Sequence, residues 1–190
     1  LNFHELTSEI SETIYEKDSV SVETLPLDHR VYTNGFLFTS RSSCRKINSK
    51  AINGLNLKPF HFDQLKKGLS ILLEDGTNIK NNELTFDPEK PKRYAYCSDT
   101  SYNRDLIPLI KQVDLLYHES TFLEKDIDLA EKTKHSTAIQ AAKIAKEAKV
   151  KKLILGHYSS RYIDKNIFFN EASTIFKDVD LSEDFKTFLV

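Results

Sequence analysis

The stretch RYAYCSDTSYNRDLIPLIKQVDLLYHES, residues 93–120, predicts a strand, a short helix and a second strand in immediate succession. The same alternation continues to residue 190. Thr137 and Gln140 have the spacing of a capping box at the start of a later helix. The expected strands are 93–97, 114–117, 152–155 and 185–190, and the expected helices are 104–113, 136–150 and 164–177. Alternating strands and helices predict an α/β layer architecture.

The first 70 residues differ from this regular part in their charge. Residues 1–25 carry a formal charge of −5, and alternating apolar and polar residues predict a strand over 20–24 and another over 35–39. Residues 41–70 hold seven basic residues and one acid, a formal charge of +6, and show no strong periodicity. This segment is interpreted as an inserted arm or long loop. A surface for a nucleic-acid backbone and an ordinary solvated basic surface are both open for it.

The composition is that of one packed domain. Of the 190 residues 39% are hydrophobic and 29% are charged, and the net charge of −1 gives no whole-chain reason to expect a polyanionic partner. No apolar run approaches the roughly 18 residues of a membrane span, so no membrane partner is expected. Cys44 and Cys97 form no CxxC pair, which excludes a disulfide framework and fits a reducing cytoplasm. The absence of Met behind a leading Leu1 suggests that the natural start lies upstream.

Polar groups follow the ends of four expected strands, and a further histidine, His135, directly precedes a helix. The four groups are Asp28-His29, Ser98-Asp99-Thr100, His118-Glu119-Ser120 and Gly156-His157. Functional groups in α/β folds collect beyond the carboxyl ends of strands. Imidazole and carboxylate are ligands that Zn²⁺ accepts when thiolates are absent. Each histidine alone is more simply a hydrogen-bonded structural residue, and each carboxylate could be a cap, but the whole set favours a metal site.

Four segments together resemble the C-terminal half of ribonuclease Z, the tRNA 3′-end endonuclease of the metallo-β-lactamase fold. They are YCSDT (96–100), DLLYHESTF (114–122), HSTA (135–138) and LILGHYSSRY (153–162). Upstream, PLDH (26–29) resembles the family's third metal-binding motif, and the basic segment 41–70 falls where the family inserts its tRNA-binding arm. The resemblance covers nearly all of residues 1–190. It implies an α/β fold, the metallo-β-lactamase αββα sandwich, with mainly its C-terminal half in this chain.

The resemblance implies a zinc-dependent endoribonuclease that removes the 3′ trailer from precursor tRNA and leaves a 3′-hydroxyl. It assigns His29 and His157 to one zinc ion each and Asp99 to a bridge between them. The intact subunit would hold two Zn²⁺ about 3.5–4 Å apart. His135 is the candidate proton donor to the leaving oxygen, oriented by Glu119. A purely structural hydrogen bond between these two residues is the alternative.

The resemblance also suggests how substrate is held. The predicted substrate-binding residues are Arg161, Ser159 and Ser160 near the metals, and Lys58, Lys66 and Lys67 in the arm. A salt bridge to Asp164 is an alternative role for Arg161. Lysines on the tRNA backbone predict an affinity that falls steeply with salt and little base specificity. The family further implies a homodimer and a cytoplasmic location.

One family motif, His-x-His-x-Asp-His, is absent from the sequence. It supplies most of the metal ligands and lies upstream of the motif at His29, so the N-terminal part of a ribonuclease Z is expected to be missing. The chain alone is therefore predicted to bind zinc weakly or not at all and not to cleave RNA. Two other functions stay open. The basic arm disfavours a hydrolase of small esters or phosphodiesters, and the retained site residues disfavour a non-catalytic RNA- or partner-binding module.

Overall fold

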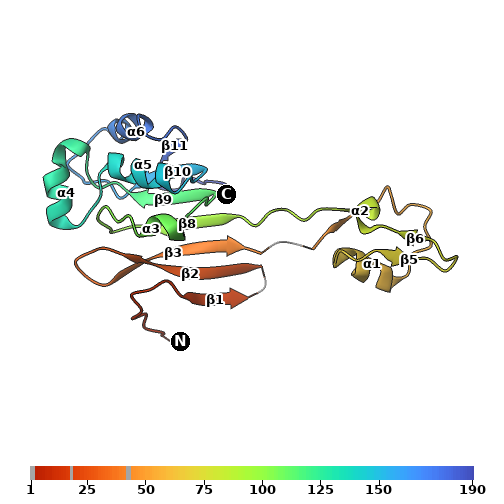
Figure 1. Ribbon diagram of the computed structural model, residues 1–190. Helices are drawn as coiled ribbons and strands as arrows, with labels where there is room; N and C mark the ends of the chain where they lie inside the picture. The colour runs from red at the N-terminus through yellow and green to blue at the C-terminus, as the bar shows by residue number, and fades with distance from the viewer. Residues whose placement is uncertain (1–2, 18, 42–43) are drawn as a thin grey trace. The chain divides into compact units, whose positions relative to one another are not determined.

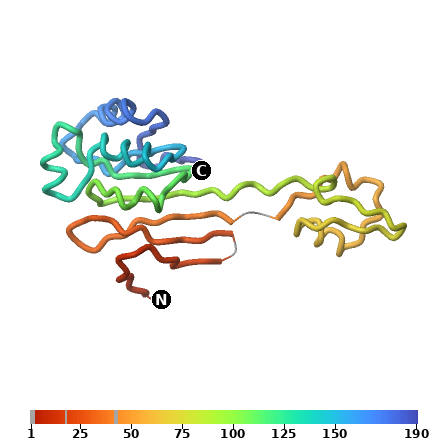
Figure 2. The backbone as a smooth tube through the Cα atoms, viewed as in Figure 1, coloured from red at the N-terminus to blue at the C-terminus, as the bar shows by residue number. Residues whose placement is uncertain are grey.

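The computed structural model describes residues 3–17, 19–41 and 44–190. The chain divides into two compact units, one made of Leu1–Ser40 with Lys92–Val190 and the other of Arg41–Pro91. The backbone leaves the first unit after β3 and re-enters it at β8, as the trace in Figure 2 shows. Because β3 and β8 pair with each other in one sheet, the second unit is an insertion in the connection between two neighbouring strands.

The first unit contains a mixed sheet (Figure 1) that has seven strands among the described residues, in the order β1-β2-β3-β8-β9-β10-β11. The strands are β1 (Thr13–Lys17), β2 (Val20–Leu27), β3 (Thr33–Ser40), β8 (Arg93–Cys97), β9 (Leu115–Glu119), β10 (Lys152–Gly156) and β11 (Val179–Leu181). β8 to β11 are parallel, whereas β1, β2 and β3 are antiparallel to their neighbours, including β3 to β8. As a result β2, β8, β9 and β10 all run in one direction, and their carboxyl ends lie at one edge.

The helices of this unit are α3 (Leu106–Leu109), α4 (Ile127–Thr133), α5 (Ala138–Glu147) and α6 (Asn166–Ser173), with a 3-10 turn, η1 (Glu124–Asp126), before α4. α5 packs against β9, β10 and α6, and buries its alanines against Leu153 and Leu155. The predicted capping box is confirmed, because Thr137 Oγ1 accepts from Gln140 N at 3.1 Å and Gln140 Oε1 accepts from Thr137 N at 2.9 Å. This cap fixes the start of α5 three residues after His135.

The predicted α/β alternation is confirmed, but four element predictions need correction. Three expected helices are shorter in the structure: 104–113 is Leu106–Leu109, 136–150 is Ala138–Glu147 and 164–177 is Asn166–Ser173. The strand expected over 185–190 is wrong, and the last strand lies earlier, at β11. Phe185 is fully exposed with a left-handed φ of 66°, so its apolar side chain does not mark a buried strand.

Three tyrosines, Tyr94 and Tyr96 of β8 and Tyr117 of β9, lie together on one face of the sheet. The rings of Tyr96 and Tyr117 stack with centroids 4.7 Å apart, and those of Phe38 and Tyr94 are 5.7 Å apart. With Phe188 and other residues after β11, these tyrosines line a hollow of about 450 Å³. Phe38 and Tyr96 are each over one-third exposed, so this face is only partly covered by the described residues.

The second unit has its own small core of Leu65, Ile71 and Leu84. Its elements are β4 (Lys46–Ile47), α1 (Pro59–Lys66), β5 (Ile71–Leu72), β6 (Asn78–Ile79), α2 (Asn81–Leu84) and β7 (Thr85–Phe86). The basic segment 41–70 is therefore the first part of a larger folded unit that ends at Pro91. β4 pairs with β7, so residues beyond 70 are needed to complete the fold of the arm.

Acids from the later part of this unit neutralise some of the basic charge. The ion pairs are Arg45–Asp87 at 2.5 Å, Lys46–Glu89 at 2.5 Å, and Lys58–Glu74. Lys66 and Lys67 form no ion pair within the part of the chain that the structure describes. The local charge of +6 over 41–70 thus overstates the free positive charge of the folded unit.

Candidate metal centre

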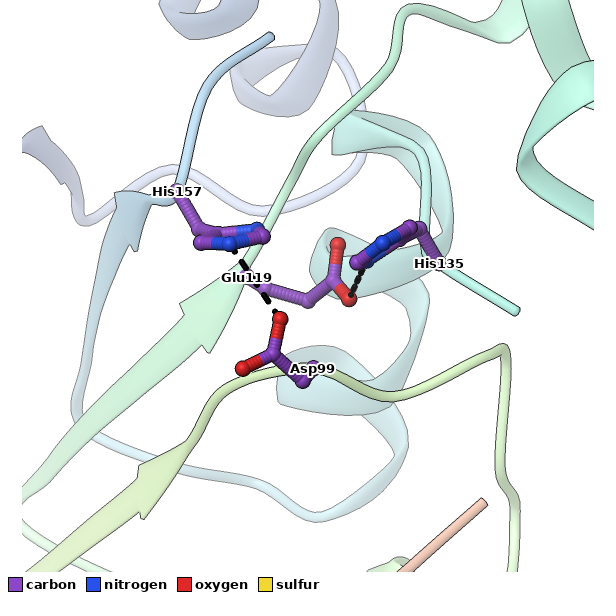
Figure 3. Close-up of side chains that lie close together, drawn as sticks. All are labelled: Asp99, Glu119, His135 and His157. Carbon is purple, nitrogen blue, oxygen red and sulfur yellow. Dashed lines mark hydrogen bonds and ion pairs between the residues drawn. The ribbon is translucent and has the colours of Figure 1, made fainter. Parts of the chain in front are cut away.

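The sheet brings the predicted site residues together at one edge. Asp99 follows β8, Glu119 ends β9 and His157 follows β10, while His135 lies two residues before Thr137, the N-cap of α5. Figure 3 shows the side chains of these four residues pointing toward one another. One ligand atom from each lies within 4.8 Å of those of the others. The prediction that these groups meet at the carboxyl ends of the strands is therefore confirmed.

Two of these residues have a backbone conformation that is rare outside glycine. Asp99 has a φ of 60° and His157 a φ of 58°, both in the left-handed region. For residues other than glycine such conformations cost on the order of 1–3 kcal/mol each and persist where the surrounding structure over-determines them. His157 comes directly after β10 and Asp99 two residues after the end of β8, and in both cases the turn directs the side chain into the cluster (Figure 3).

Glu119 is fully buried and serves as the acceptor at the centre of the cluster. Its Oε1 accepts from Thr100 N at 2.8 Å and His135 Nδ1 at 2.7 Å. Its Oε2 accepts from Ser136 N at 3.1 Å, Thr121 N at 3.2 Å and Thr121 Oγ1 at 2.6 Å. Burial alone would raise the pKa of Glu119, but the hydrogen bonds from His135 and Thr121 outweigh it and hold the pKa below its ordinary value. Five donors leave this carboxylate little capacity for a metal.

The ring of His135 is held in place by its hydrogen bond to Glu119. The hydrogen bond from Nδ1 to Glu119 raises the pKa of His135, although burial opposes the shift. Its ring centroid lies 5.2 Å from that of His157 and 5.0 Å from that of His29. The imidazole is therefore a neighbour of both predicted histidine ligands, with Nδ1 bonded to the carboxylate and Nε2 left for another partner.

The pair formed by His157 and Asp99 provides the donor set that suits zinc. His157 Nε2 lies 3.2 Å from Asp99 Oδ1, and both side chains are about two-fifths exposed. An imidazole nitrogen and a carboxylate oxygen at this separation can bind the same cation. His157 Nδ1 is occupied on the opposite side of the ring by Thr121 Oγ1 at 2.8 Å.

His29 lies in the turn between β2 and β3, outside the cluster of four, and its ring neighbours that of His135. Its Nδ1 donates to the backbone oxygen of Lys134 at 2.8 Å, which leaves Nε2 as a potential ligand. The neighbouring Asp28 accepts from Ser101 Oγ and, at 3.0 Å, from Lys134 Nζ. These contacts lower the pKa of Asp28, first through Ser101, and fasten the turn to the loop after β8.

The loop after His157 carries the predicted phosphate-binding residues. Arg161 Nε donates to Ser159 Oγ at 3.3 Å, and the guanidinium lies 5.3 Å from the centroid of the Phe122 ring. Asp164 accepts from Asn166 N at 2.9 Å and forms no ion pair with Arg161 in the described part of the chain, so the alternative role of Arg161 is not seen. Ser160 is exposed in the same loop.

Thr121 and Lys134 are among the residues with contacts at the site that were not predicted as functional. Thr121 bonds both Glu119 and His157, and Lys134 bonds His29 through its backbone. Thr121 lies inside a segment that carries the family resemblance, but no spacing rule separates it from an ordinary strand-end threonine. Lys134 contributes a carbonyl group, which every residue has, so only its left-handed φ of 59° distinguishes it.

Comparison with curated proteins confirms the resemblance. The chain is 47% identical to a protein named Ribonuclease Z from Cytophaga hutchinsonii, with 100% of the chain and 61% of that protein aligned. It is 42% identical to a Ribonuclease Z from Phocaeicola vulgatus, with 92% of the chain and 56% of that protein aligned. The chain thus spans about three-fifths of the length of these relatives, and corresponds to a C-terminal part of them. No protein-family model matches the sequence.

Solved structures confirm the fold. The metallo-β-lactamase fold protein YhfI from Bacillus subtilis matches 90% of this chain with a TM-score of 0.58 and 18% identity, over 50% of its own length. The short form of human tRNase Z matches 94% of the chain with a TM-score of 0.54 and 21% identity, over 46% of its own length. The chain therefore has part of the metallo-β-lactamase fold, with a mixed central sheet.

Proposed function

We propose that this chain, as a homologue of the C-terminal part of ribonuclease Z, belongs to a zinc-dependent endoribonuclease that removes the 3′ trailer from precursor tRNA. The observation that carries the proposal is the convergence of Asp99, Glu119, His135 and His157 at one sheet edge in a relative of ribonuclease Z. The activity is proposed for the full-length protein. For these 190 residues alone we propose weak or no zinc binding and no cleavage, because they offer only three of the expected ligands.

His157, Asp99 and His29 would hold the metal ions, two zinc ions per intact subunit. The Nε2 atom of His29, the Nε2 atom of His157 beside Asp99 Oδ1, and the partly exposed carboxylate of Asp99 suit this role, whereas Glu119 is saturated by hydrogen bonds. Bound zinc would polarise water and neutralise negative charge on the scissile phosphate. The remaining ligands would come from the segment in which the family carries His-x-His-x-Asp-His.

His135 would protonate the leaving 3′-oxygen of the tRNA. Its hydrogen bond to Glu119 raises its pKa and directs Nε2 away from the carboxylate, so Nε2 is the atom from which a protonated imidazole would donate. Glu119 acts by orienting the ring, and its burial keeps the carboxylate out of contact with solvent. His135, which is slightly exposed, would therefore donate the proton, and the fully buried Glu119 would hold its ring in place.

Substrate would be held at two places on the chain. Arg161, Ser159 and Ser160 follow His157 directly and could bind a phosphate next to the metals. In the inserted unit, Lys66 and Lys67 are the stronger candidates for the tRNA backbone. Lys58 is the weaker one, since its ammonium group already pairs with Glu74.

Precursor tRNA as partner, a homodimer and a cytoplasmic location are part of the same proposal. In the described residues, none of the helices has the length and apolar character required to cross a membrane. The resemblance alone supports the dimer and the compartment.

Cleavage of a precursor tRNA by the full-length protein tests the function. We expect a product with a 3′-hydroxyl, loss of cleavage on treatment with a chelator, and recovery on addition of zinc. His157→Ala should abolish activity and reduce the zinc content. Cleavage of a small phosphodiester but not of precursor tRNA would contradict the proposal, as would RNA binding without any cleavage in the presence of zinc.

A further inference from the structure

Thr121 occupies the position between the buried carboxylate of Glu119 and the imidazole of His157. Its Oγ1 lies 2.6 Å from Glu119 Oε2 and 2.8 Å from His157 Nδ1. The side chain is nearly buried, with 7% of the residue exposed. One hydroxyl therefore joins the residue that orients His135 to a predicted metal ligand that directly follows another strand, β10.

The single proton of the hydroxyl decides the direction of both hydrogen bonds. Glu119 accepts from three backbone N–H groups, those of Thr100, Thr121 and Ser136, so both of its oxygens act as acceptors, as those of an ionised carboxylate do, and such a group has no proton of its own to donate. Thr121 must then donate its proton to Glu119 Oε2. It has no second proton, so it accepts from His157 Nδ1–H.

This direction leaves the other nitrogen of His157 pointing at Asp99. With the proton fixed on Nδ1, Nε2 faces Asp99 Oδ1 at 3.2 Å and can offer its lone pair to a cation shared with that carboxylate. In metal sites, a partner that accepts from the non-ligating nitrogen fixes the tautomer and the ring orientation of the histidine.

The main chain of Thr121 keeps the hydroxyl in place. Its N–H donates to Glu119 Oε2 at 3.2 Å, and its carbonyl oxygen accepts from Ser159 N at 3.1 Å in the loop after His157. The residue is thus bonded to both of the segments that it connects. A rotation that freed His157 would also break the bond to Glu119.

We propose that Thr121 is a positioning residue that fixes the Nδ1–H tautomer of His157 and so presents Nε2 to a metal ion. The Glu119 carboxylate then orients two histidines, His135 directly and His157 through Thr121. The inference deepens the proposed function and rests on its metal site.

The test is zinc affinity of the full-length protein, measured by competition with a chromophoric chelator, for Thr121→Val and Thr121→Ser. Valine keeps the shape but removes the hydroxyl, so we expect a loss of about 10–100-fold in affinity for one zinc ion. Serine restores the hydroxyl and should bind within about threefold of the wild type. Thr174→Val is the matched control, since among the described residues its hydroxyl bonds Glu171 O alone, at the end of α6, and it should leave affinity unchanged.

A double-mutant cycle separates positioning from a general structural effect. In the His157→Ala background, Thr121→Val should cause no further loss of zinc affinity, because the ring that it positions is gone. Thr121→Val with wild-type affinity, or an equal loss in the His157→Ala background, would overturn the inference.

The outcomes for the two proposals are distinct. A protein that shows the expected zinc pattern but leaves precursor tRNA uncut would refute the proposed function alone. A protein that cuts precursor tRNA but shows no effect of Thr121→Val would refute the inference alone.

Discussion

Replacing Glu119 with Gln should destabilise the fold because the substitution puts an amide NH₂ among donors. Glu119 accepts five hydrogen bonds, two at Oε1 and three at Oε2. The amide nitrogen cannot accept any of them. Its least costly position is that of Oε1, where His135 can change tautomer and accept, so that only Thr100 N–H loses its acceptor.

The expected cost is about 3 kcal/mol of unfolding free energy. A buried donor left without an acceptor costs about 1–3 kcal/mol, and hydrogen bonds to a neutral oxygen are roughly half as strong as those to a carboxylate.

The pH dependence of this cost follows from the shifted pKa values of Glu119 and His135. The lowered pKa of Glu119 contributes stability above its unfolded value of about 4.3 and loses it as pH falls further.

The raised pKa of His135 makes the free energy of unfolding fall, rather than rise, with increasing pH. Its contribution is complete below its unfolded value of about 6.5 and is lost as pH rises through the higher folded pKa. The difference between the wild type and Glu119→Gln should therefore be largest between about pH 4.5 and 6.5 and smaller at pH 8.5. At high pH part of it remains, because the backbone N–H bonds to the carboxylate do not titrate.

Urea unfolding of the metal-free full-length protein, followed by far-UV circular dichroism at pH 5.5, 7.0 and 8.5, measures this difference. Glu131→Gln is the control, because Glu131 is exposed on α4, and it should change the free energy by less than about 0.5 kcal/mol. The reasoning fails if Glu119→Gln costs under about 1 kcal/mol at pH 5.5, or if the cost is the same at pH 8.5.

Three further predictions follow from the site and the inserted unit. His135→Ala in the full-length protein should slow precursor-tRNA cleavage about 10²–10⁴-fold with unchanged zinc content; loss of zinc on metal analysis would make His135 a ligand instead. Replacing both Lys66 and Lys67 with Ala should weaken tRNA binding and reduce the slope of log affinity against log salt by about 1.8 in a filter-binding series, and an unchanged slope would remove them from the RNA contact. Gly156→Ala should destabilise the protein by about 1–3 kcal/mol in thermal unfolding, because its Cβ would lie 2.2 Å from Tyr117 Oη, and unchanged stability would show that the tyrosine ring moves freely.

The sequence by itself determined the local parts of this protein. The alternation of strands and helices, the Thr137–Gln140 cap and the polar residue after each parallel strand are set by hydrophobic period and local hydrogen bonding, which act between neighbours in the chain. Since parallel strands end at one edge, even the convergence of Asp99, Glu119 and His157 could be predicted. The strand expected over 185–190 failed because apolar residues there are not buried, and burial depends on the rest of the fold.

Only the tertiary structure decided which partner each polar group has. The positive charge of residues 41–70 is partly neutralised by Asp87, Glu89 and Glu74, which belong to the same folded unit but lie beyond the basic segment. Likewise, Thr121 meets His157 across 36 residues, and its single proton fixes the tautomer of that ring. Hydrogen bonds and ion pairs require contact within a few ångströms, so residue type and spacing cannot assign them until the sheet has brought distant segments together.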